Sequence, residues 1–306
     1  MGLVASLSPR GASGFGASST AEQVTAGCDL AGKTYLLTGC NSGIGQETLR
    51  VLHRRGARVL AAARTVDKAR AATLACAPGA IPIACELSEP ASVRTCIEEV
   101  TRDGARLAGI IANAGIMALP KLTVHHGLEL QFLTNHIGHF MLVTGLLDQL
   151  ADDGRVVMVS SEAHRRAPRE GIDFDNLAGE RSYSPWGAYG RSKLANLLFA
   201  NELARRFAGS RRTANAIHPG VIATKLTRNM GTLMGLVWGA VSPALLKSIP
   251  QGAATQCYVA CHRAVAAVSG AYFSNCNVAR PTAPGRDAAL ATRLWAESER
   301  IVARLG

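Results

Sequence analysis

A tyrosine and a lysine four residues apart are the side chains in this sequence best suited to move a proton. Tyr189 and Lys193 stand in the stretch 188–193, Ala-Tyr-Gly-Arg-Ser-Lys, and an apolar pattern at helical spacing follows through residue 203. On a helix, side chains at positions i and i+4 share one face and can touch. A phenol has a pKa of about 10, and a neighbouring ammonium favours the phenolate and lowers that pKa. The pair could therefore carry a proton to or from a substrate oxygen.

A glycine-rich turn between a strand and a helix is a second candidate for chemistry. Residues 38–45, Thr-Gly-Cys-Asn-Ser-Gly-Ile-Gly, follow an apolar run and precede a helical pattern. Glycines permit a tight turn and close approach of the backbone to a pyrophosphate, and the helix N-terminus supplies free N–H groups. The spacing is T-G-x-x-x-G-x-G rather than G-x-G-x-x-G. Because a strand precedes it and a helix follows, nucleotide binding is favoured over a plain glycine turn.

The end of the second expected strand favours NADP(H) over NAD(H). An NAD-binding protein of this kind presents Asp or Glu about 20 residues after the glycine turn, whereas this chain has no acidic residue between Glu47 and Asp67. Arg64 stands at that strand end, where a guanidinium could bind a 2′-phosphate, and Lys68 could assist. The alternative is a plain surface arginine. Glu86, after the third strand, is a further candidate for contact with the adenine.

Other polar residues follow the remaining strands. Asn113-Ala114-Gly115 and Ser160-Ser161 come after the fourth and fifth, at the carboxyl edge where ligands of α/β proteins bind. His136 and His139 lie in a helical pattern without a third ligand at metal-like spacing, so packing or hydrogen-bonding roles are expected. The eight cysteines form no C-x-x-C pair and no metal-like spacing with histidine. No metal site is expected, and a reducing compartment is indicated.

An alternation of strands and helices has to position these residues. Apolar runs predict strands at 34–37, 58–62, 81–85, 107–112, 155–159, 213–217 and 271–273. Helical patterns lie after Gly43 and at 66–76, 91–102, 128–150, 186–207, 251–263 and 287–304. This alternation predicts an α/β fold, a doubly wound (Rossmann) and mostly parallel sheet with helices on both faces. Residues 31–306 are expected to form a single domain, and residues 1–30 a flexible, Ser/Gly-rich arm.

Composition argues against several other classes of protein. Apolar residues make up 48% of the chain and charged residues 18%, which permits a large buried core. The net charge of +11 comes from scattered basic pairs rather than a basic stripe with aromatics, so no nucleic-acid partner is expected. No stretch approaches about 20 apolar residues, the length of a membrane span. The first 30 residues are poor in acids, like a transit peptide, and begin with a myristoylation pattern. A cytoplasmic location is expected, with a plastid or a membrane surface as the alternative.

Several of these motifs occur together and in a fixed order. Thr38–Gly45, Asn113-Ala114-Gly115, Asn135, Ser161, Tyr189 with Lys193, and Pro219-Gly220 resemble the short-chain dehydrogenase/reductase family over roughly residues 15–304. Stretches 135–140, 192–196, 218–221 and 269–276 are similar to its retinol-dehydrogenase subgroup, which includes the WW-domain oxidoreductase and plant and bacterial members without WW domains. The resemblance implies a seven-stranded sheet and NADP(H)-dependent chemistry on CH–OH or C=O groups. The chain departs from the pattern at Cys40, where Ala is more usual, and at Thr65, where Asp is frequent.

The resemblance also implies roles by position. Tyr189 would be the general acid/base, and Lys193 would lower its pKa and hold the cofactor ribose. Ser161, with Ser160 as the alternative, would polarise the substrate oxygen, and Asn135 would hold a water in the proton relay. The implied NADP(H)-binding residues are Gly39, Asn41, Ser42, Gly43, Ile44, Gly45, Arg64, Glu86, Leu87, Asn113, Ala114, Gly115, Tyr189, Lys193, Pro219, Gly220, Val221 and Thr224. Members often pair through 128–150 and 186–207, so a homodimer is implied by analogy.

Residues 225–250 are expected to form a substrate lid. The segment is strongly apolar, with Met230, Met234 and Trp238, and is too broken by glycine and Pro243 to span a bilayer. It would either pack on its own core, or admit a lipophilic aldehyde, ketone or alcohol and contact a membrane peripherally. Two other functions are open, an NADP(H)-sensing regulatory or scaffold protein and a protochlorophyllide-reductase-like enzyme. The intact set of catalytic side chains favours an oxidoreductase.

Overall fold

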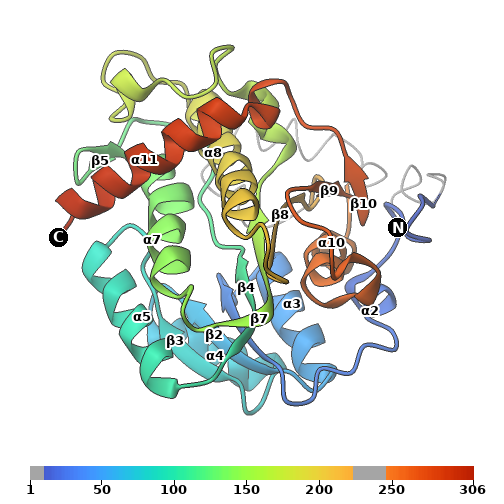
Figure 1. The fold of residues 1–306 in the computed structure, drawn as a ribbon. Helices are drawn as coiled ribbons and strands as arrows, with labels where there is room; N and C mark the ends of the chain where they lie inside the picture. The colour runs from blue at the N-terminus through green and yellow to red at the C-terminus, as the bar shows by residue number, and fades with distance from the viewer. Residues whose placement is uncertain (1–9, 223–245) are drawn as a thin grey trace.

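Eight strands form the central sheet (Figure 1). The computed structural model describes residues 10–222 and 246–306. The strands are β1 (Thr34–Thr38), β2 (Arg58–Ala63), β3 (Ile81–Ala84), β4 (Leu107–Ala112), β7 (Leu150–Val159), β8 (Thr213–His218), β9 (Tyr272–Ser274) and β10 (Asn277–Ala279). Their spatial order is β10-β9-β8-β7-β4-β1-β2-β3. Within this sheet, β1, β2, β3, β4, β7, β8 and β9 run parallel to one another, and β10 returns antiparallel to β9.

The sheet is doubly wound about the junction of β1 and β4. Leu37 of β1 pairs in register with Ala61 of β2 on one side and with Ile111 of β4 on the other. The strand order runs outward from this junction in both directions, so the loops that leave β1 and β4 diverge at the carboxyl edge. That divergence opens a crevice for ligands. All residues of β1 and β8 are buried, as expected for parallel strands that helices cover on both faces.

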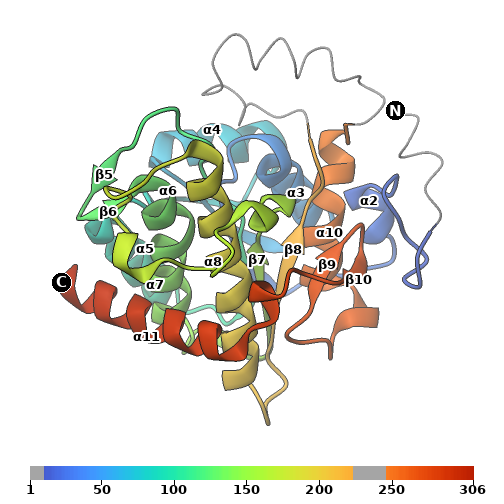
Figure 2. The same cartoon turned by 90° about the horizontal axis from the view of Figure 1, so that it is seen from above.

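Helices form a layer on each face of the sheet, as Figure 2 shows from above. The helices that cover the two faces are α3 (Gly43–Arg54), α4 (Val66–Cys76) and α10 (Ile249–Cys261) on one, and α5 (Pro90–Asp103), α7 (Gly138–Gly145) and α8 (Pro185–Arg206) on the other. The alternating residues of β1 divide between the layers, since Leu37 packs into the first and Leu36 into the second. This is the period-2 pattern of a strand buried between two cores.

Shorter elements join these layers. They are the helices α2 (Ala21–Val24), α6 (Leu130–Phe132) and α11 (Ala288–Arg304), the π-helix η1 (Leu133–Ile137), the 3-10 helices η2 (Glu162–Arg166), η3 (Phe174–Asn176), η5 (Arg263–Val265) and η6 (Pro284–Arg286), and the hairpin strands β5 (Val124–His125) and β6 (Leu128–Glu129).

The predicted fold class is confirmed, and the seven predicted strands are the seven parallel strands. Three features differ from the expectations. The antiparallel β10 and the β5–β6 hairpin were not predicted, because strands of two or three residues leave no periodic signal. The helix expected at 128–150 is divided into α6, η1 and α7 and ends at Gly145. In the expected lid, residues 223–245 lie outside the described residues, and Ile249 and Pro250 already belong to α10, whose cap is Ser248.

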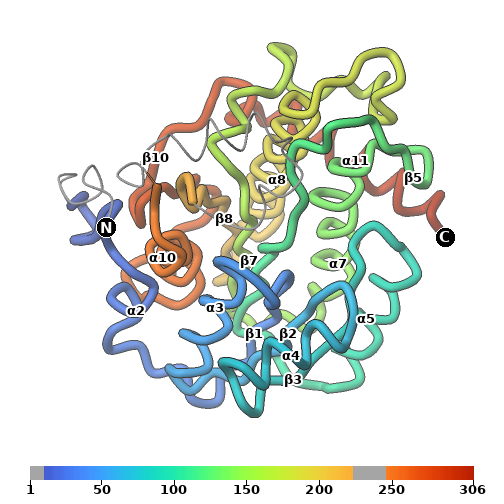
Figure 3. Tube along the Cα trace, turned by 180° about the vertical axis from the view of Figure 1, so that it is seen from behind, coloured from blue at the N-terminus to red at the C-terminus, as the bar shows by residue number. Residues whose placement is uncertain are grey.

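The N-terminal segment differs from the expected flexible arm, because its described part packs on the domain. Thr20 and Gln23 form a reciprocal capping box on α2, which lies against α10 (Figure 3). Ala21 and Val24 are fully buried, and the ring of Phe15 meets that of Tyr258 at 5.6 Å. A few apolar side chains therefore suffice to anchor this segment on the domain, although its composition is that of a flexible linker.

The C-terminal helix α11 lies across α7 and α8 (Figure 1). The ring of Trp295 stacks 5.5 Å from that of Phe199 in α8 and meets Phe140 of α7 at 5.0 Å. Leu294 and Ile301 join the cluster that contains Leu194 and Leu198 of α8. The helix therefore covers the outer side of the two segments through which the resemblance implied pairing.

No helix in the described part of the chain is both long and apolar enough to cross a membrane.

Candidate active site at the carboxyl edge of the sheet

The glycine turn between β1 and α3 forms a cradle at the switch point of the sheet. Gly39 has a left-handed φ of +70°, and a Cβ at Gly45 would overlap the Gly39 carbonyl oxygen and lie 2.6 Å from Asn113 Nδ2. Among the described residues no side chain caps α3 at Ser42, so its first N–H groups face out of the turn. Glycines where side chains cannot fit, next to uncapped amides, suit the pyrophosphate of a dinucleotide.

The departure at Cys40 does not disturb this cradle. Its backbone N–H donates to Ala62 at the end of β2 (3.2 Å), and its side chain is fully buried. Burial raises the pKa of the Cys40 thiol to about 12, so it behaves as a small apolar group.

A buried hydrogen-bond network locks the turn to the next strand and to η1. Thr38 Oγ1 accepts from the backbone N–H of Asn113 and of Ala114, each at 3.0 Å, and lies 2.9 Å from His139 Nε2. His139 Nδ1 lies 2.9 Å from the carbonyl of Asn135, which can only accept, so Nδ1 carries the proton. Nε2 is then the acceptor of the Thr38 hydroxyl. The expected hydrogen-bonding role of His139 is confirmed, and His136 likewise contacts Ser298 Oγ at 2.8 Å.

Stability should depend on pH through His139. Burial lowers the pKa of His139 from 6.5 to about 4, so the unfolded chain binds more protons between these values and stability is lost as pH falls through that window. At about 1.4 kcal/mol per pH unit, we expect His139 alone to remove about 1 kcal/mol between pH 7 and pH 5.5. Urea unfolding of the wild type and of His139→Gln at both pH values measures this difference. Equal pH dependence in the two proteins would contradict it.

Tyr189 and Lys193 lie on the first turns of α8, as predicted from their spacing. Ser184 caps this helix by accepting from the Gly187 N–H, and Pro185 occupies its first turn. Both catalytic candidates are buried, and Lys193 Nζ lies 5.7 Å from the centroid of the Tyr189 ring. Lys193 Nζ also donates to the carbonyl of Val159 at the end of β7 (2.9 Å). The helix thus presents the pair to the carboxyl edge of the sheet.

The two serines after β7 occupy different environments. Ser160 is buried, and its hydroxyl donates to the Lys193 carbonyl at 2.7 Å. Ser161 is partly exposed, accepts from the Ala163 N–H at 3.1 Å, and contacts the Tyr189 phenol. Ser160 therefore has a structural hydrogen bond, and Ser161 is the serine whose hydroxyl lies beside Tyr189.

The expected effect of Lys193 on the tyrosine needs correction. Burial raises the pKa of Tyr189 to about 12, and the nearby Ser161 hydroxyl opposes that rise. Burial also lowers the pKa of Lys193 to about 8, since its amine faces the Val159 carbonyl rather than a charge. Desolvation therefore dominates both groups. A spacing of four residues predicts that the tyrosine and the lysine lie close together on a helix. It does not predict which acceptor the flexible lysine amine donates to.

Asn135 fastens the loop after β4 to the helix that carries Lys193. Its Oδ1 accepts from the Ile116 N–H at 2.8 Å, while Nδ2 donates to the Ile116 carbonyl and to Ser192 Oγ, both at 2.9 Å. A Cβ at Gly115 would lie 3.0 Å from Asn135 Oδ1 and 3.3 Å from Lys193 Nζ. The π-turn places Asn135 here, in keeping with the frequent occurrence of π-bulges at functional sites.

The predicted adenosine side lies around the ends of β2 and β3. Arg64 follows β2 directly and is exposed, beside the glycine turn that Ala62 anchors. Glu86 Oε1 accepts from the hydroxyl of Ser88 at 2.9 Å. Leu87 is buried where Gly138 of α7 passes so closely that a Cβ there would overlap its carbonyl.

The predicted nicotinamide side is the turn after β8. Gly220 has a φ of +97°, and the carbonyl of Val221 accepts from the Lys247 N–H at 2.9 Å. Lys247 packs on Gly220, where a Cβ would lie 2.6 Å from its Cδ. The lysine was not singled out in the sequence, because the contact joins two segments 27 residues apart. Pro219, Gly220 and Val221 lie at the same edge as Ser161, whereas Thr224 is outside the described residues.

Trp186 is a further site residue that the sequence could have revealed. Three residues before Tyr189 on the same helix, its ring meets the tyrosine ring edge-on at 6.1 Å. The guanidinium of Arg166 lies 4.9 Å from the Trp186 ring. Trp186 therefore lies between the Arg166 guanidinium and the Tyr189 ring.

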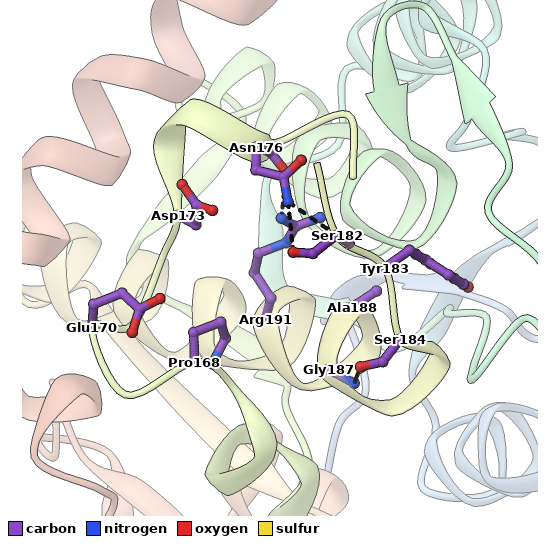
Figure 4. Close-up of a pocket in the computed structure, with 10 residues that line it drawn as sticks. All are labelled: Pro168, Glu170, Asp173, Asn176, Ser182, Tyr183, Ser184, Gly187, Ala188 and Arg191. Carbon is purple, nitrogen blue, oxygen red and sulfur yellow. Dashed lines mark hydrogen bonds between the residues drawn. The ribbon is translucent and has the colours of Figure 1, made fainter. Parts of the chain in front are cut away.

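A separate pocket lies between α8 and the segment 168–184 (Figure 4). Arg191 reaches into its wall and donates to the Asn176 carbonyl at 2.6 Å. Because Arg191 follows Tyr189 by two residues on a helix, the two side chains point to opposite sides. The pocket is therefore separate from the candidate site around Tyr189.

Comparisons with known proteins agree with this geometry. The family described as short chain dehydrogenase matches residues 33–233. The short-chain dehydrogenase TIC 32 B, chloroplastic, of Brassica napus is 43% identical over 95% of both chains. Retinol dehydrogenase 12 of Mus musculus is 39% identical over 89% of this chain and 86% of its own. An uncharacterised protein of Mycobacterium paratuberculosis has a crystal structure with a TM-score of 0.73, at 35% identity over 91% of this chain and 97% of its own. A short-chain dehydrogenase of Burkholderia cenocepacia in complex with NADP, at 22% identity, shares the fold with a TM-score of 0.62 over 80% of this chain and 96% of its own.

Proposed function

Since this chain belongs to the short-chain dehydrogenase/reductase family, and is thus an oxidoreductase, we propose that it transfers hydride between NADP(H) and a carbonyl or alcohol carbon. One observation carries the proposal. The Tyr189 phenol, the Ser161 hydroxyl and the Lys193 amine converge at the end of β7, across the switch point from the glycine turn. A dinucleotide laid across that crevice would bring a reactive ring to the tyrosine.

The residues present fit a nicotinamide dinucleotide. The glycine turn would hold the pyrophosphate, and Arg64 would hold the 2′-phosphate that distinguishes NADP(H) from NAD(H). Gly115 lets the backbone after β4 pass close to Asn135 and Lys193, because a Cβ there would lie 3.0 Å from Asn135 Oδ1. When bound, the nicotinamide supplies the hydride or accepts it.

The chain's own residues handle the proton. Tyr189 would give its phenolic proton to the substrate oxygen during reduction and take it back during oxidation. The Ser161 hydroxyl would donate to the same oxygen and hold it beside the phenol. Lys193 would stabilise the phenolate once its amine turns from the Val159 carbonyl, and Asn135 would keep the lysine-bearing helix in register and hold a water of the relay.

A lipophilic carbonyl compound or alcohol is the substrate class that we infer. Residues 225–250 are strongly apolar in sequence and connect to the nicotinamide side of the site at Val221 and Lys247. A relative at 39% identity is named for retinol, a lipophilic alcohol. Relatives from Brassica napus are named as chloroplastic, which supports a plastid as the location.

NADPH oxidation with a panel of carbonyl compounds tests this function. Long-chain and isoprenoid aldehydes are compared with short polar aldehydes of equal reactivity, each with NADPH and with NADH. We expect turnover, with kcat/KM rising with the length of the apolar substituent. Turnover confined to short polar carbonyls would contradict the substrate class, and NADPH binding without turnover on any compound would favour a cofactor sensor instead.

A further inference from the structure

Three potential metal ligands converge outside the active site, at the start of α5. Nε2 of His125 lies 2.7 Å from Glu89 Oε1, and Nε2 of His126 lies 3.3 Å from Glu89 Oε2. One nitrogen or oxygen atom from each side chain lies within 4.8 Å of the other two. The two imidazole centroids are only 4.1 Å apart. Neither histidine belongs to the crevice that holds Tyr189, so the catalytic site leaves this cluster without a role.

The backbone brings these side chains together in an uncommon way. Successive residues of a strand point to opposite faces, so neighbouring histidines would ordinarily diverge. Here β5 ends at His125, and His126 and Gly127 form the turn to β6 with φ values of +51° and +73°. A left-handed conformation at a residue with a side chain costs roughly 1–2 kcal/mol. That conformation turns the second imidazole back toward the same carboxylate.

The carboxylate comes from a different part of the chain. Glu89 precedes the first residue of α5, Pro90, and no side chain of the described residues caps that helix. Glu89 lies 36 residues before His125 in the chain. It comes directly after the segment Glu86–Ser88 at the predicted adenosine side. The cluster therefore links two segments, the β5–β6 hairpin and the loop that follows β3. The hairpin leads into α6 and η1.

The chemistry of the donor set matches a first-row transition-metal ion. Two imidazole nitrogens and one carboxylate oxygen are the set that holds zinc where water keeps the fourth position. The three side chains are 35–47% exposed, so water can reach that position. Tetrahedral ligand bonds of about 2.0–2.2 Å place such atoms about 3.4 Å apart, near the 3.3 Å between His126 Nε2 and Glu89 Oε2, and the 2.7 Å hydrogen bond of His125 to Glu89 Oε1 would have to open to admit the ion.

We propose that Glu89, His125 and His126 form a surface binding site for Zn²⁺, with water as the fourth ligand. The ion would replace the two hydrogen bonds between imidazole and carboxylate and would fasten the β5–β6 hairpin to the start of α5. Because it binds the folded arrangement, the ion should raise the resistance of the protein to unfolding by mass action.

Zinc titration of the full chain by calorimetry tests the proposal. We expect wild-type protein to bind one Zn²⁺ at this site, and Glu89→Gln, His125→Asn and His126→Asn each to weaken that binding by about tenfold or more, as for loss of one of three ligands. The matched controls are Cys28→Ser, which removes a half-buried thiol, and His53→Asn, which removes a histidine of α3. Both should bind zinc as the wild type does.

A second measurement guards against misfolded variants and other binding sites. Added Zn²⁺ should raise the Tm of the wild type and of the two controls, and a chelator should reverse the rise. The Glu89→Gln variant, with its near-identical shape, should keep the metal-free Tm but lose the rise. Equal zinc affinity in wild type and all three ligand variants would overturn the proposal, as would zinc binding that Cys28→Ser abolishes.

Discussion

Replacing Tyr189 with phenylalanine is expected to lower kcat by about 10²–10⁴, the span typical for loss of a positioned acid or base. The substitution removes only the hydroxyl that Ser161 contacts, and it leaves the ring that packs against Trp186. KM for NADPH should change little, because the glycine turn and Arg64 are untouched. Steady-state kinetics with the best substrate of the carbonyl panel measures both constants.

Tyr183 provides a matched control for that substitution. It is a second tyrosine near the start of α8, but its hydroxyl donates to the Leu119 carbonyl and it borders the pocket on the other side of the helix (Figure 4). Tyr183→Phe should therefore keep kcat within a small factor of the wild type. Near-normal turnover in Tyr189→Phe, or an equal loss in both variants, would remove Tyr189 from the proposed mechanism.

Replacing Arg64 with alanine is expected to weaken NADPH binding by about 1.5–3 kcal/mol, the usual contribution of hydrogen bonds to a charged group. Arg64 is exposed at the end of β2 and makes no ion pair with any residue that the structure describes, so its loss should leave the fold intact. NADH lacks the 2′-phosphate, and its affinity should barely move.

The loss of NADPH affinity is measured by titrating each cofactor separately and monitoring the quenching of protein fluorescence. Arg70→Ala is the matched control, since Arg70 is an exposed arginine of the adjoining helix α4 that pairs with Asp67 at 3.2 Å. It should bind NADPH as the wild type does. An equal loss of affinity for NADPH and NADH in Arg64→Ala would show that Arg64 does not read the phosphate.

Much of the framework follows from local patterns in the chain. The apolar runs became the parallel strands, because strands that helices cover on both faces are buried along their length and are mostly apolar. The glycine turn lies at the switch point, as its place after the first strand predicts, and Gly45 must be glycine because a Cβ there would collide with Gly39 and Asn113. Tyr189 and Lys193 lie on one helix, α8, as the apolar pattern around them predicts.

What the sequence did not reveal depends on contacts between distant segments. The described part of the N-terminal segment packs on the domain through Phe15 and Val24, which composition cannot show. The π-turn around Asn135 has no periodic signature that differs from an α-helix. His125 and His126 have metal-like spacing with no other residue along the chain, and only the left-handed turn brings them to Glu89. The roles of Lys247 and Ser160 likewise required the strand ends to be placed in space.

The C-terminal helix has a consequence for the behaviour of the enzyme on dilution. By seating Trp295 against Phe140 and Phe199, α11 covers from within one chain apolar side chains of α7 and α8 that would otherwise be exposed. Because α11 belongs to the same chain, its local concentration beside α7 and α8 stays constant when the protein is diluted. Specific activity should thus be the same at nanomolar and micromolar enzyme, and a loss at the lower concentration would show that another copy completes the site.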